Sequence, residues 1–185
     1  MLSKLKTTLT FFSFFISLGV SLISLIASSY RVQESYQCIP CGSDCDKDTY
    51  SAEGKCPHCN MKLVKKSTIH FKTIQPSEIC EYIKAHPNVV LLDVRTKDEF
   101  EGNANPNFGS LKNAINLPIQ VLEEKISTLD AYKDKEIIVY CSHSHRSPRA
   151  SYILTQHGFS NVTNLAGGMS AMNDRTCMTR MTRID

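Results

Sequence analysis

The sequence has little net charge, since 21 Lys and Arg residues nearly balance 18 Asp and Glu residues and leave a formal charge of +3 at pH 7. The basic residues are scattered and form no long stripe interleaved with aromatic side chains. Nucleic acid binding relies on such clustered basic residues, because they neutralise the phosphate backbone. The composition therefore argues against nucleic acid as a partner.

The region around the first cysteines lacks two known motifs, a lipidation motif and a complete calcium-binding loop. No lipobox precedes Cys38, so we expect no lipid attached there. The acidic run from Asp44 to Asp48 is spaced like the start of a calcium-binding loop, but Lys55 stands at the twelfth position, where that loop needs Glu. We therefore expect no calcium site in this stretch.

Charged residues are also missing from residues 7–29, which form an apolar stretch after Lys4 and Lys6. Small residues at 27–29 offer cleavage positions, and the stretch is just long enough to span a bilayer. A signal peptide and an uncleaved membrane anchor both fit residues 1–29. The positive N-terminal side predicts that the rest of the chain lies outside the cytoplasm, on the periplasmic side, either released or anchored in the inner membrane.

The length of 185 residues leaves room for one medium domain plus a small module and this leader. Shifts in composition divide the remainder into a cysteine-rich module at 36–66, a main domain at 67–172 and a tail at 173–185.

The module holds five of the eight cysteines. Two Cys-x2-Cys pairs are separated by fourteen residues, and each is followed by a residue that tolerates left-handed backbone, Gly42 or Asn60. Such turns direct both thiolates of a pair at one ion, and four thiolates suit tetrahedral zinc in a zinc-ribbon-like site or another thiophilic ion such as Cu(I). Metal binding would supply most of the folding free energy of so small a module. The predicted ligands are Cys38, Cys41, Cys56 and Cys59.

Alternatives to this ligand set remain open. Cys45 and His58 are spare ligands within the same module. Outside the cytoplasm, the cysteines could instead form two disulfides or one redox-active pair.

The main domain alternates short apolar runs with helical patterns, which favours an α/β fold with a parallel sheet flanked by helices. The run at 89–94 is continuously apolar, as expected of a strand buried on both faces. Ser77 is the expected cap of the first helix, which ends at His86. The expected strands are 70–74, 89–94, 114–117, 136–140 and 161–164, and the expected helices are 77–85, 98–101, 121–129 and 148–156.

Cys141 follows the central expected strand and stands in a tight polar loop just before a helix. In that geometry the loop amides and the helix N-terminus form an anion cradle, which favours the nucleophilic thiolate. Arg146 adds a positive charge and planar donors suited to an oxyanion. These observations predict an enzyme that works through Cys141 and Arg146, with substrate-binding residues Ser142, His143, Ser144, His145 and Ser147.

The region from about His70 to Met172 resembles the rhodanese family of sulfurtransferases. The resemblance rests on five motifs in order, which are Leu91-Leu92-Asp93-Val94-Arg95, Glu99-Phe100, Ala114-Ile115-Asn116-Leu117-Pro118, the Cys141 loop and Asn164-Leu165-Ala166-Gly167-Gly168-Met169. It implies a persulfide on Cys141 that carries sulfane sulfur from a donor such as thiosulfate to a thiol or cyanide acceptor, with no cofactor required. It also implies that Asp93 and Arg95 support neighbouring loops.

Loop length separates sulfurtransferases of this fold from related phosphatases and arsenate reductases. The relatives carry Cys-x5-Arg, whereas Cys141 and Arg146 form the shorter Cys-x4-Arg, which favours sulfur over phosphate. The chain departs from the family at Ser144, where many members have glycine, and at His143 and His145, which could make activity depend on pH.

The cysteine-rich module resembles the heavy-metal-binding domain of bacterial metal-efflux proteins. The matching residues are Tyr36-x-Cys38 and Gly54-Lys55-Cys56-Pro57-x-Cys59-x-Met61. Together the two resemblances predict a sulfurtransferase with a metal-binding module. The alternative is a non-catalytic heavy-metal or sulfide-binding protein that uses the same fold as a scaffold. Of the remaining cysteines, we expect Cys80 to be packed within its helix and Cys177 not to resolve a persulfide.

Overall fold

The computed structural model describes residues 33–40 and 43–179. The predicted leader at 1–29 lies outside the described residues. Among the residues that are described, no helix is both long and apolar enough to cross a membrane.

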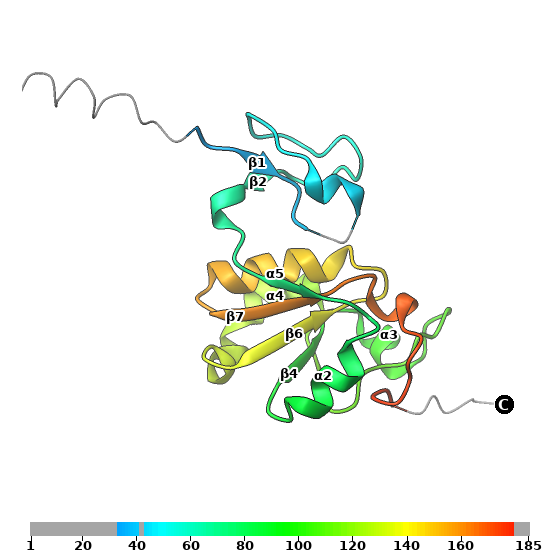
Figure 1. The fold of residues 1–185 in the computed structure, drawn as a ribbon. Helices are drawn as coiled ribbons and strands as arrows, with labels where there is room; N and C mark the ends of the chain where they lie inside the picture. Colours follow the sequence, from blue (N-terminus) through cyan, green and yellow to red (C-terminus); the bar gives the residue numbers. More distant parts are fainter. Residues whose placement is uncertain (1–32, 41–42, 180–185) are drawn as a thin grey trace, which may run out of the picture. The chain divides into compact units, whose positions relative to one another are not determined.

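A five-stranded parallel sheet forms the centre of the main domain (Figure 1). Its strand order is β3-β7-β6-β4-β5, and every neighbouring pair is parallel. The register pairs Asp93 with Tyr140 and Val139 with Asn164, so the carboxyl ends of three strands meet at one edge. The strands are β3 (Lys72–Ile74), β4 (Val90–Asp93), β5 (Ile115–Asn116), β6 (Glu136–Tyr140) and β7 (Asn161–Leu165).

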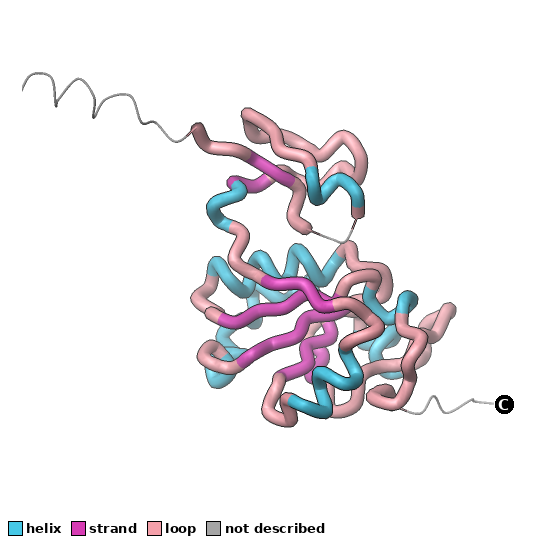
Figure 2. The backbone as a smooth tube through the Cα atoms, in the orientation of Figure 1, coloured by secondary structure: helices cyan, strands magenta, loops and turns pink. Residues whose placement is uncertain are grey.

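Helices cover both faces of this sheet (Figures 1 and 2). They are α2 (Ile79–Ala85), α3 (Lys97–Glu101), α4 (Ile119–Lys125) and α5 (Arg146–Gln156), with 3-10 turns at Asp44–Lys47, Lys66–Thr68, Ile126–Tyr132 and Gly168–Ala171. Because side chains alternate along a strand, β6 supplies two separate cores. Ile137 and Val139 pack with α4 and α5, whereas Ile138 and Tyr140 pack with α2.

The expected elements agree with this fold, with differences at their ends. The central strand has the predicted bounds, and α5 begins at Arg146 rather than at Pro148. The predicted cap at Ser77 is wrong: α2 begins at Ile79 after a turn, with Glu78 at its N-cap. That turn is closed by the Glu78 backbone N–H, which donates to the carbonyl of Gln75 at 3.0 Å. The helix expected at 121–129 is shorter and continues as a 3-10 turn.

The described part of the tail packs against the main domain. Met178 forms a β-bridge with Leu111, and Thr179 donates its N–H to the carbonyl of Ser110 at 2.8 Å. Cys177 is joined to Cys80 of α2 by a disulfide. The sequence analysis treated these two cysteines separately and did not predict their pairing.

Candidate active site and metal centre

Cys141 lies directly after the last residue of β6 and is buried. Its Sγ lies 3.4 Å from the Oγ of Ser147, which belongs to the first turn of the eleven-residue helix α5. The sulfur therefore sits at the amino end of a helix, where the macrodipole favours negative charge. This is the placement that the sequence predicted for a nucleophilic cysteine.

The loop after Cys141 contains a left-handed residue without being glycine. Ser144 has a φ of 58°, at the position where many members of the resembled family have glycine. A side chain there costs about 1–2 kcal/mol of backbone strain. Ser144 is buried, and its Oγ donates to the carbonyl of Leu165 and accepts from the Nδ2 of Asn164, both at 3.4 Å. Its hydroxyl thus ties the strained residue to β7.

A second loop, which follows β7, is hydrogen bonded to the backbone of the Cys141 loop. The backbone N–H groups of Met169 and Ser170 donate to the carbonyls of Cys141 and Ser142 at 2.8 and 2.9 Å. Gly168 allows this approach, because a Cβ on it would lie 2.4 Å from the Cys141 carbonyl oxygen. Gly168 therefore lets this loop fix the backbone at Cys141.

Arg146 does not present an open guanidinium fork. Its Nη1 and Nη2 atoms donate to the two carboxylate oxygens of Glu99 at 2.6 and 2.7 Å, and Glu99 also accepts from the Ser142 hydroxyl at 2.7 Å. The Arg146 guanidinium holds the pKa of Glu99 well below its usual range, and the same pair raises the pKa of Arg146. Arg146 and Ser142 are thereby fastened to helix α3.

The sequence analysis gave Glu99 no role beyond marking the family. A capping box holds it in place, since Glu99 accepts from the Thr96 backbone N–H while its own N–H donates to the Thr96 hydroxyl. The Thr-x-x-Glu spacing could have located this residue at a helix start. Nothing in the local sequence, however, identifies Arg146 as its partner across 47 residues.

Asp93 and Arg95 form an ion pair that is almost fully buried, with Arg95 Nη2 at 2.6 Å from Asp93 Oδ2. The same Nη2 donates to the carbonyl of Gly109 and to the hydroxyl of Ser110. Asn116 donates to the carbonyls of both paired residues. These contacts brace the loop before β5; the supporting role in the active site that the family resemblance implied stays a prediction.

The two histidines of the loop are exposed, unlike the serines at 142, 144 and 147, which are buried. His143 packs edge-on against Phe108, with the ring centroids 5.2 Å apart. His143 and His145 therefore lie at the rim of the site, while Cys141 lies inside it.

Four cysteines of the module converge on one point. Their sulfur atoms all lie within 4.8 Å of one another, which approaches the separation of about 3.8 Å set by tetrahedral zinc with bonds of about 2.3 Å. Although burial opposes it, hydrogen bonds from the backbone N–H groups of Cys59 and His58 lower the pKa of Cys56 to about 7. The donor set thus fits a thiophilic ion. The four are Cys38, Cys45, Cys56 and Cys59.

Three of the predicted ligands, Cys38, Cys56 and Cys59, belong to this cluster of described residues. Cys45, considered a spare ligand from the sequence, joins them from the 3-10 turn Asp44–Lys47. Cys41 lies outside the described residues, as does the turn expected at Gly42. The turn expected at Asn60 is present, with a φ of 59°. His58 is exposed and lies 3.4 Å from an oxygen of Asp48.

Residues 77–175, more than half of the chain, match the family model of the rhodanese-like domain, and residues 43–66 match that of the heavy metal binding domain. The chain belongs to the rhodanese-like domain family. Both resemblances inferred from the sequence are confirmed. The matched rhodanese-like region extends three residues beyond the boundary predicted at 172.

Several known proteins share this rhodanese-like region. The tRNA uridine(34) hydroxylases of Hamiltonella defensa subsp. Acyrthosiphon pisum (strain 5AT) and of Cytophaga hutchinsonii are each 31% identical, over 55% and 60% of this chain. The chain spans only 30% and 35% of those two proteins.

A solved structure with a TM-score above 0.5 shares the fold, and a second one is similar in sequence. A Rhodopseudomonas palustris protein of unknown function, described as a possible tyrosine phosphatase, has a TM-score of 0.51 and 21% identity over 60% of this chain and 85% of that one. A rhodanese-related protein of Thermoplasma volcanium is 35% identical over 55% of this chain and 89% of that one, with a TM-score of 0.46.

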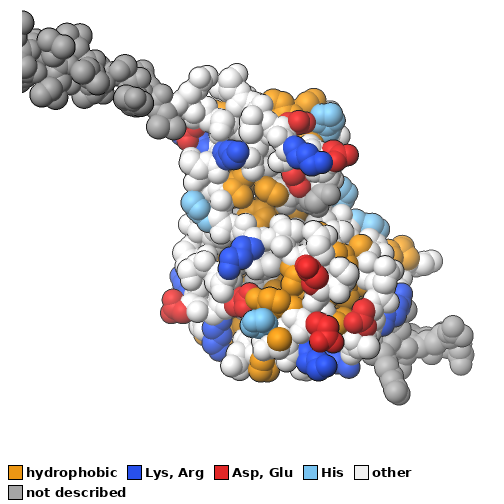
Figure 3. All heavy atoms as spheres, viewed as in Figure 1, with side chains coloured by type: hydrophobic (Ala, Val, Ile, Leu, Met, Phe, Trp, Pro, Cys, Tyr) orange, Lys and Arg blue, Asp and Glu red, His pale blue; other side chains and the backbone are white. Residues whose placement is uncertain are grey.

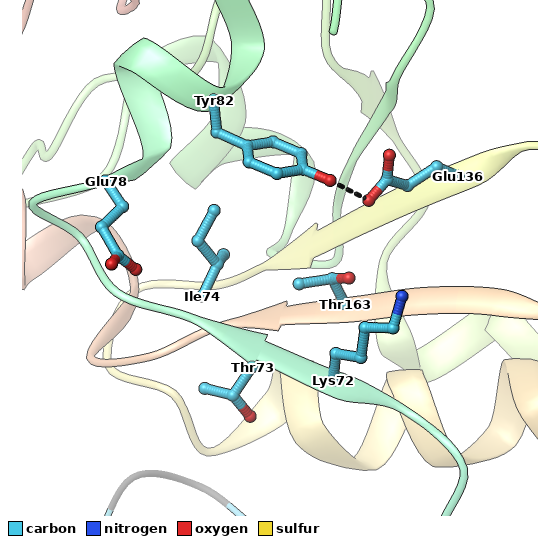
Figure 4. Close-up of a pocket in the computed structure, with 7 residues that line it drawn as sticks. All are labelled: Lys72, Thr73, Ile74, Glu78, Tyr82, Glu136 and Thr163. Carbon is cyan, nitrogen blue, oxygen red and sulfur yellow. Dashed lines mark hydrogen bonds between the residues drawn. The ribbon is translucent and has the colours of Figure 1, made fainter. Parts of the chain in front are cut away.

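The rhodanese-like domain also has a hollow of about 390 Å³ away from Cys141 (Figure 4). Tyr82 of α2 spans it and hydrogen bonds to Glu136, the first residue of β6. Cys141 follows the other end of the same strand and does not line the hollow. Its lining residues are Lys72, Thr73, Ile74, Glu78, Tyr82, Glu136 and Thr163.

Proposed function

We propose that the rhodanese-like domain transfers sulfane sulfur through a persulfide on Cys141. The observation that carries this proposal is the burial of Cys141 between the end of β6 and the first turn of α5. The N-terminus of α5 places partial positive charge beside the Cys141 sulfur, and the hydrogen bonds to Glu99 and from Met169 hold the surrounding loop in one position. The Cys-x4-Arg loop length also supports sulfur transfer over phosphate chemistry.

The reaction proceeds in two displacements. The Cys141 thiolate attacks the outer sulfur of thiosulfate, the S–S bond breaks, and sulfite leaves with the bonding electron pair. The resulting Cys141 persulfide is then attacked at its terminal sulfur by a thiolate or cyanide, which leaves with that sulfur and restores the Cys141 thiolate. No oxidant or reductant is consumed in the cycle with cyanide, and thiocyanate is the product.

Two arguments set this proposal apart from the activity named for the curated relatives. The chain spans about a third of those tRNA uridine(34) hydroxylases, so their whole activity does not carry over. On the face in Figure 3, basic and acidic side chains are interspersed, and the sequence has no long basic stripe interleaved with aromatic residues that would suit an RNA backbone.

The test is thiocyanate formation by the full-length chain from thiosulfate and cyanide, beside persulfide detection by mass spectrometry. Several donors, including glutathione persulfide, are used so that one poor donor does not decide the result. Wild-type protein gains one sulfur atom on Cys141, and Cys141→Ser gains none and forms no product. A protein that accepts sulfur from no donor would instead be the non-catalytic metal- or sulfide-binding scaffold. Turnover of an aryl phosphate or of arsenate would instead indicate a phosphatase or an arsenate reductase.

The heavy metal binding domain is proposed to hold one thiophilic ion, zinc in the first instance, through the four converging cysteines. The ion would cross-link a module whose core is little more than these cysteines and Leu63. Metal analysis of Cys45→Ser beside Cys41→Ser decides the fourth ligand, because only the true ligand lowers metal content. Absence of metal together with loss of titratable thiols would favour disulfides in the module.

The leader is proposed to place both domains outside the cytoplasm, either released or anchored in the inner membrane. A fusion of residues 1–40 to a reporter that is active only after export tests this proposal. An inactive reporter would contradict export, and carbonate extraction of the full-length chain distinguishes an anchor from a cleaved signal.

A further inference from the structure

Two of the positive charges near Cys141 are paired with carboxylates of the protein. Arg95 is held by Asp93 and Arg146 by Glu99, whereas Arg149 of α5 is exposed. The first pair is fully buried, and the side chains of the second are 29% and 20% exposed. The arginine expected to receive an oxyanion is therefore engaged before any donor arrives.

Glu99 is held too firmly to leave Arg146 on its own. It receives two hydrogen bonds from Arg146, one from Ser142, and two from the backbone and hydroxyl of Thr96, all at 2.6–3.0 Å. The lowered pKa of Glu99 means that it stays ionised at neutral pH. An incoming oxyanion would have to compete with a carboxylate that is bidentate and preorganised.

Sulfur donors differ in the charge next to the sulfur that they transfer. Thiosulfate carries two negative charges over a very small group, so its sulfonate end must enter the cradle together with the transferred sulfur. A hydropersulfide, R–S–SH, carries at most one negative charge at that end, and its remaining groups can stay outside. A site beside an ionised carboxylate penalises the dianion more strongly than the persulfide.

We propose that Glu99 determines the donor class, and that by occupying Arg146 it favours low-charge hydropersulfides over thiosulfate and similar dianions. This inference rests on the proposed sulfur transfer through Cys141. In the favoured step the Cys141 thiolate attacks the outer sulfur of R–S–SH, the S–S bond breaks, and R–S⁻ leaves. The terminal sulfur retains its proton, so Cys141–S–SH forms without any oxidant.

The test compares kcat/KM for glutathione persulfide and for thiosulfate, with one acceptor, in the wild type and in Glu99→Gln. Gln keeps the capping-box geometry and one acceptor oxygen but removes the charge. The matched control is Glu101→Gln, which removes the same charge from the same helix at an exposed site paired with Lys97. The wild type favours the persulfide, and the preference falls about tenfold or more in Glu99→Gln but stays unchanged in Glu101→Gln.

The ratio of kcat/KM for the persulfide to kcat/KM for thiosulfate shows whether Glu99 determines donor specificity or only supports the structure of the loop. If Glu99 only braces the loop, its substitution lowers both constants by the same factor, and the inference is overturned. A wild-type preference for thiosulfate also overturns it. Failure of every donor to place sulfur on Cys141 refutes the proposed function itself, which is a distinct result.

A second measurement does not depend on the folding of any variant. Salt screens repulsion between Glu99 and a dianion, so wild-type kcat/KM for thiosulfate should rise with ionic strength relative to that for the persulfide. A relative fall would indicate net attraction of the dianion by a free cation and would contradict the inference.

Discussion

Replacing Gly168 by Ala provides a direct test of how the active-site loop is held. Gly168 has a φ of 62°, and an added Cβ would meet three backbone atoms, the Cys141 carbonyl oxygen at 2.4 Å and the carbonyl carbon and oxygen of Ser142 at 2.7 Å. None of these atoms belongs to a flexible side chain that could move aside. The catalytic loop must therefore separate from the loop after β7.

The expected cost has two parts. Left-handed backbone for Ala costs about 1 kcal/mol, and overpacking against fixed atoms costs about 1–3 kcal/mol. The sum of about 2–4 kcal/mol corresponds to a fall in Tm of about 4–16 °C for a chain of this size. Activity should fall further than stability requires, because the bonds from Met169 and Ser170 fix the backbone that carries Cys141.

Gly158→Ala is the matched control, since Gly158 has a φ of 87° but no atom within 4 Å of the added Cβ. It should lower stability by about 1 kcal/mol and leave sulfur transfer unchanged. Thermal unfolding and persulfide formation on Cys141 are measured for both variants. Equal losses of stability, or full activity in Gly168→Ala, would refute the argument that close backbone contact holds the nucleophile.

Three further predictions concern the sulfur sites and the ion pair. Cys177→Ser should lower the free energy of unfolding by up to about 4 kcal/mol, because the disulfide to Cys80 closes a loop of 97 residues. Chemical denaturation measures this loss. A reductant should destabilise the wild type but not the variant. Cys45→Ser should lower zinc affinity while His58→Ala does not, and competition with a chelator decides between them. Because the pKa of Glu99 is lowered in the folded state, its ionised form stabilises the fold at pH values above the unfolded pKa near 4.5, and this contribution is lost as the pH falls toward the folded pKa. The free energy of unfolding, measured by chemical denaturation between pH 7 and pH 2, should therefore fall more steeply in the wild type than in Glu99→Gln. Parallel curves for the two proteins would contradict this.

The sequence predicted the elements whose cause is local. Strand β6 is a short apolar run between polar segments, so its bounds could be read directly. The same holds for Cys141, because a strand, a polar loop and a helix follow one another without a gap. The first turn of α5 was missed, since the loop residues Arg146 and Ser147 give no sign of already being helical.

Contacts between distant segments could not be predicted from local patterns. Glu99 meets Arg146 only because α3 and the catalytic loop lie at the same edge of the sheet. Cys80 and Cys177 pair because the tail runs back along the loop before β5. The same limit applies in the module, where Cys45 is brought to the cluster by a 3-10 turn rather than by a Cys-x2-Cys spacing.

The chain keeps its sulfur atoms in three distinct environments. This arrangement is compatible with reduced sulfur chemistry in the proposed oxidising location. An exported protein meets conditions that oxidise thiols, yet persulfide chemistry needs a reduced Cys141. The pair Cys80 and Cys177 is already a disulfide, which is the state that such a compartment favours. Thiolates bound to a metal would be protected by coordination, and Cys141 is only 1% exposed, so another protein's thiol cannot reach it without passing the loop. Burial of Cys141 thus limits exchange with protein disulfides, whereas a hydropersulfide needs to bring only its outer sulfur to the thiolate.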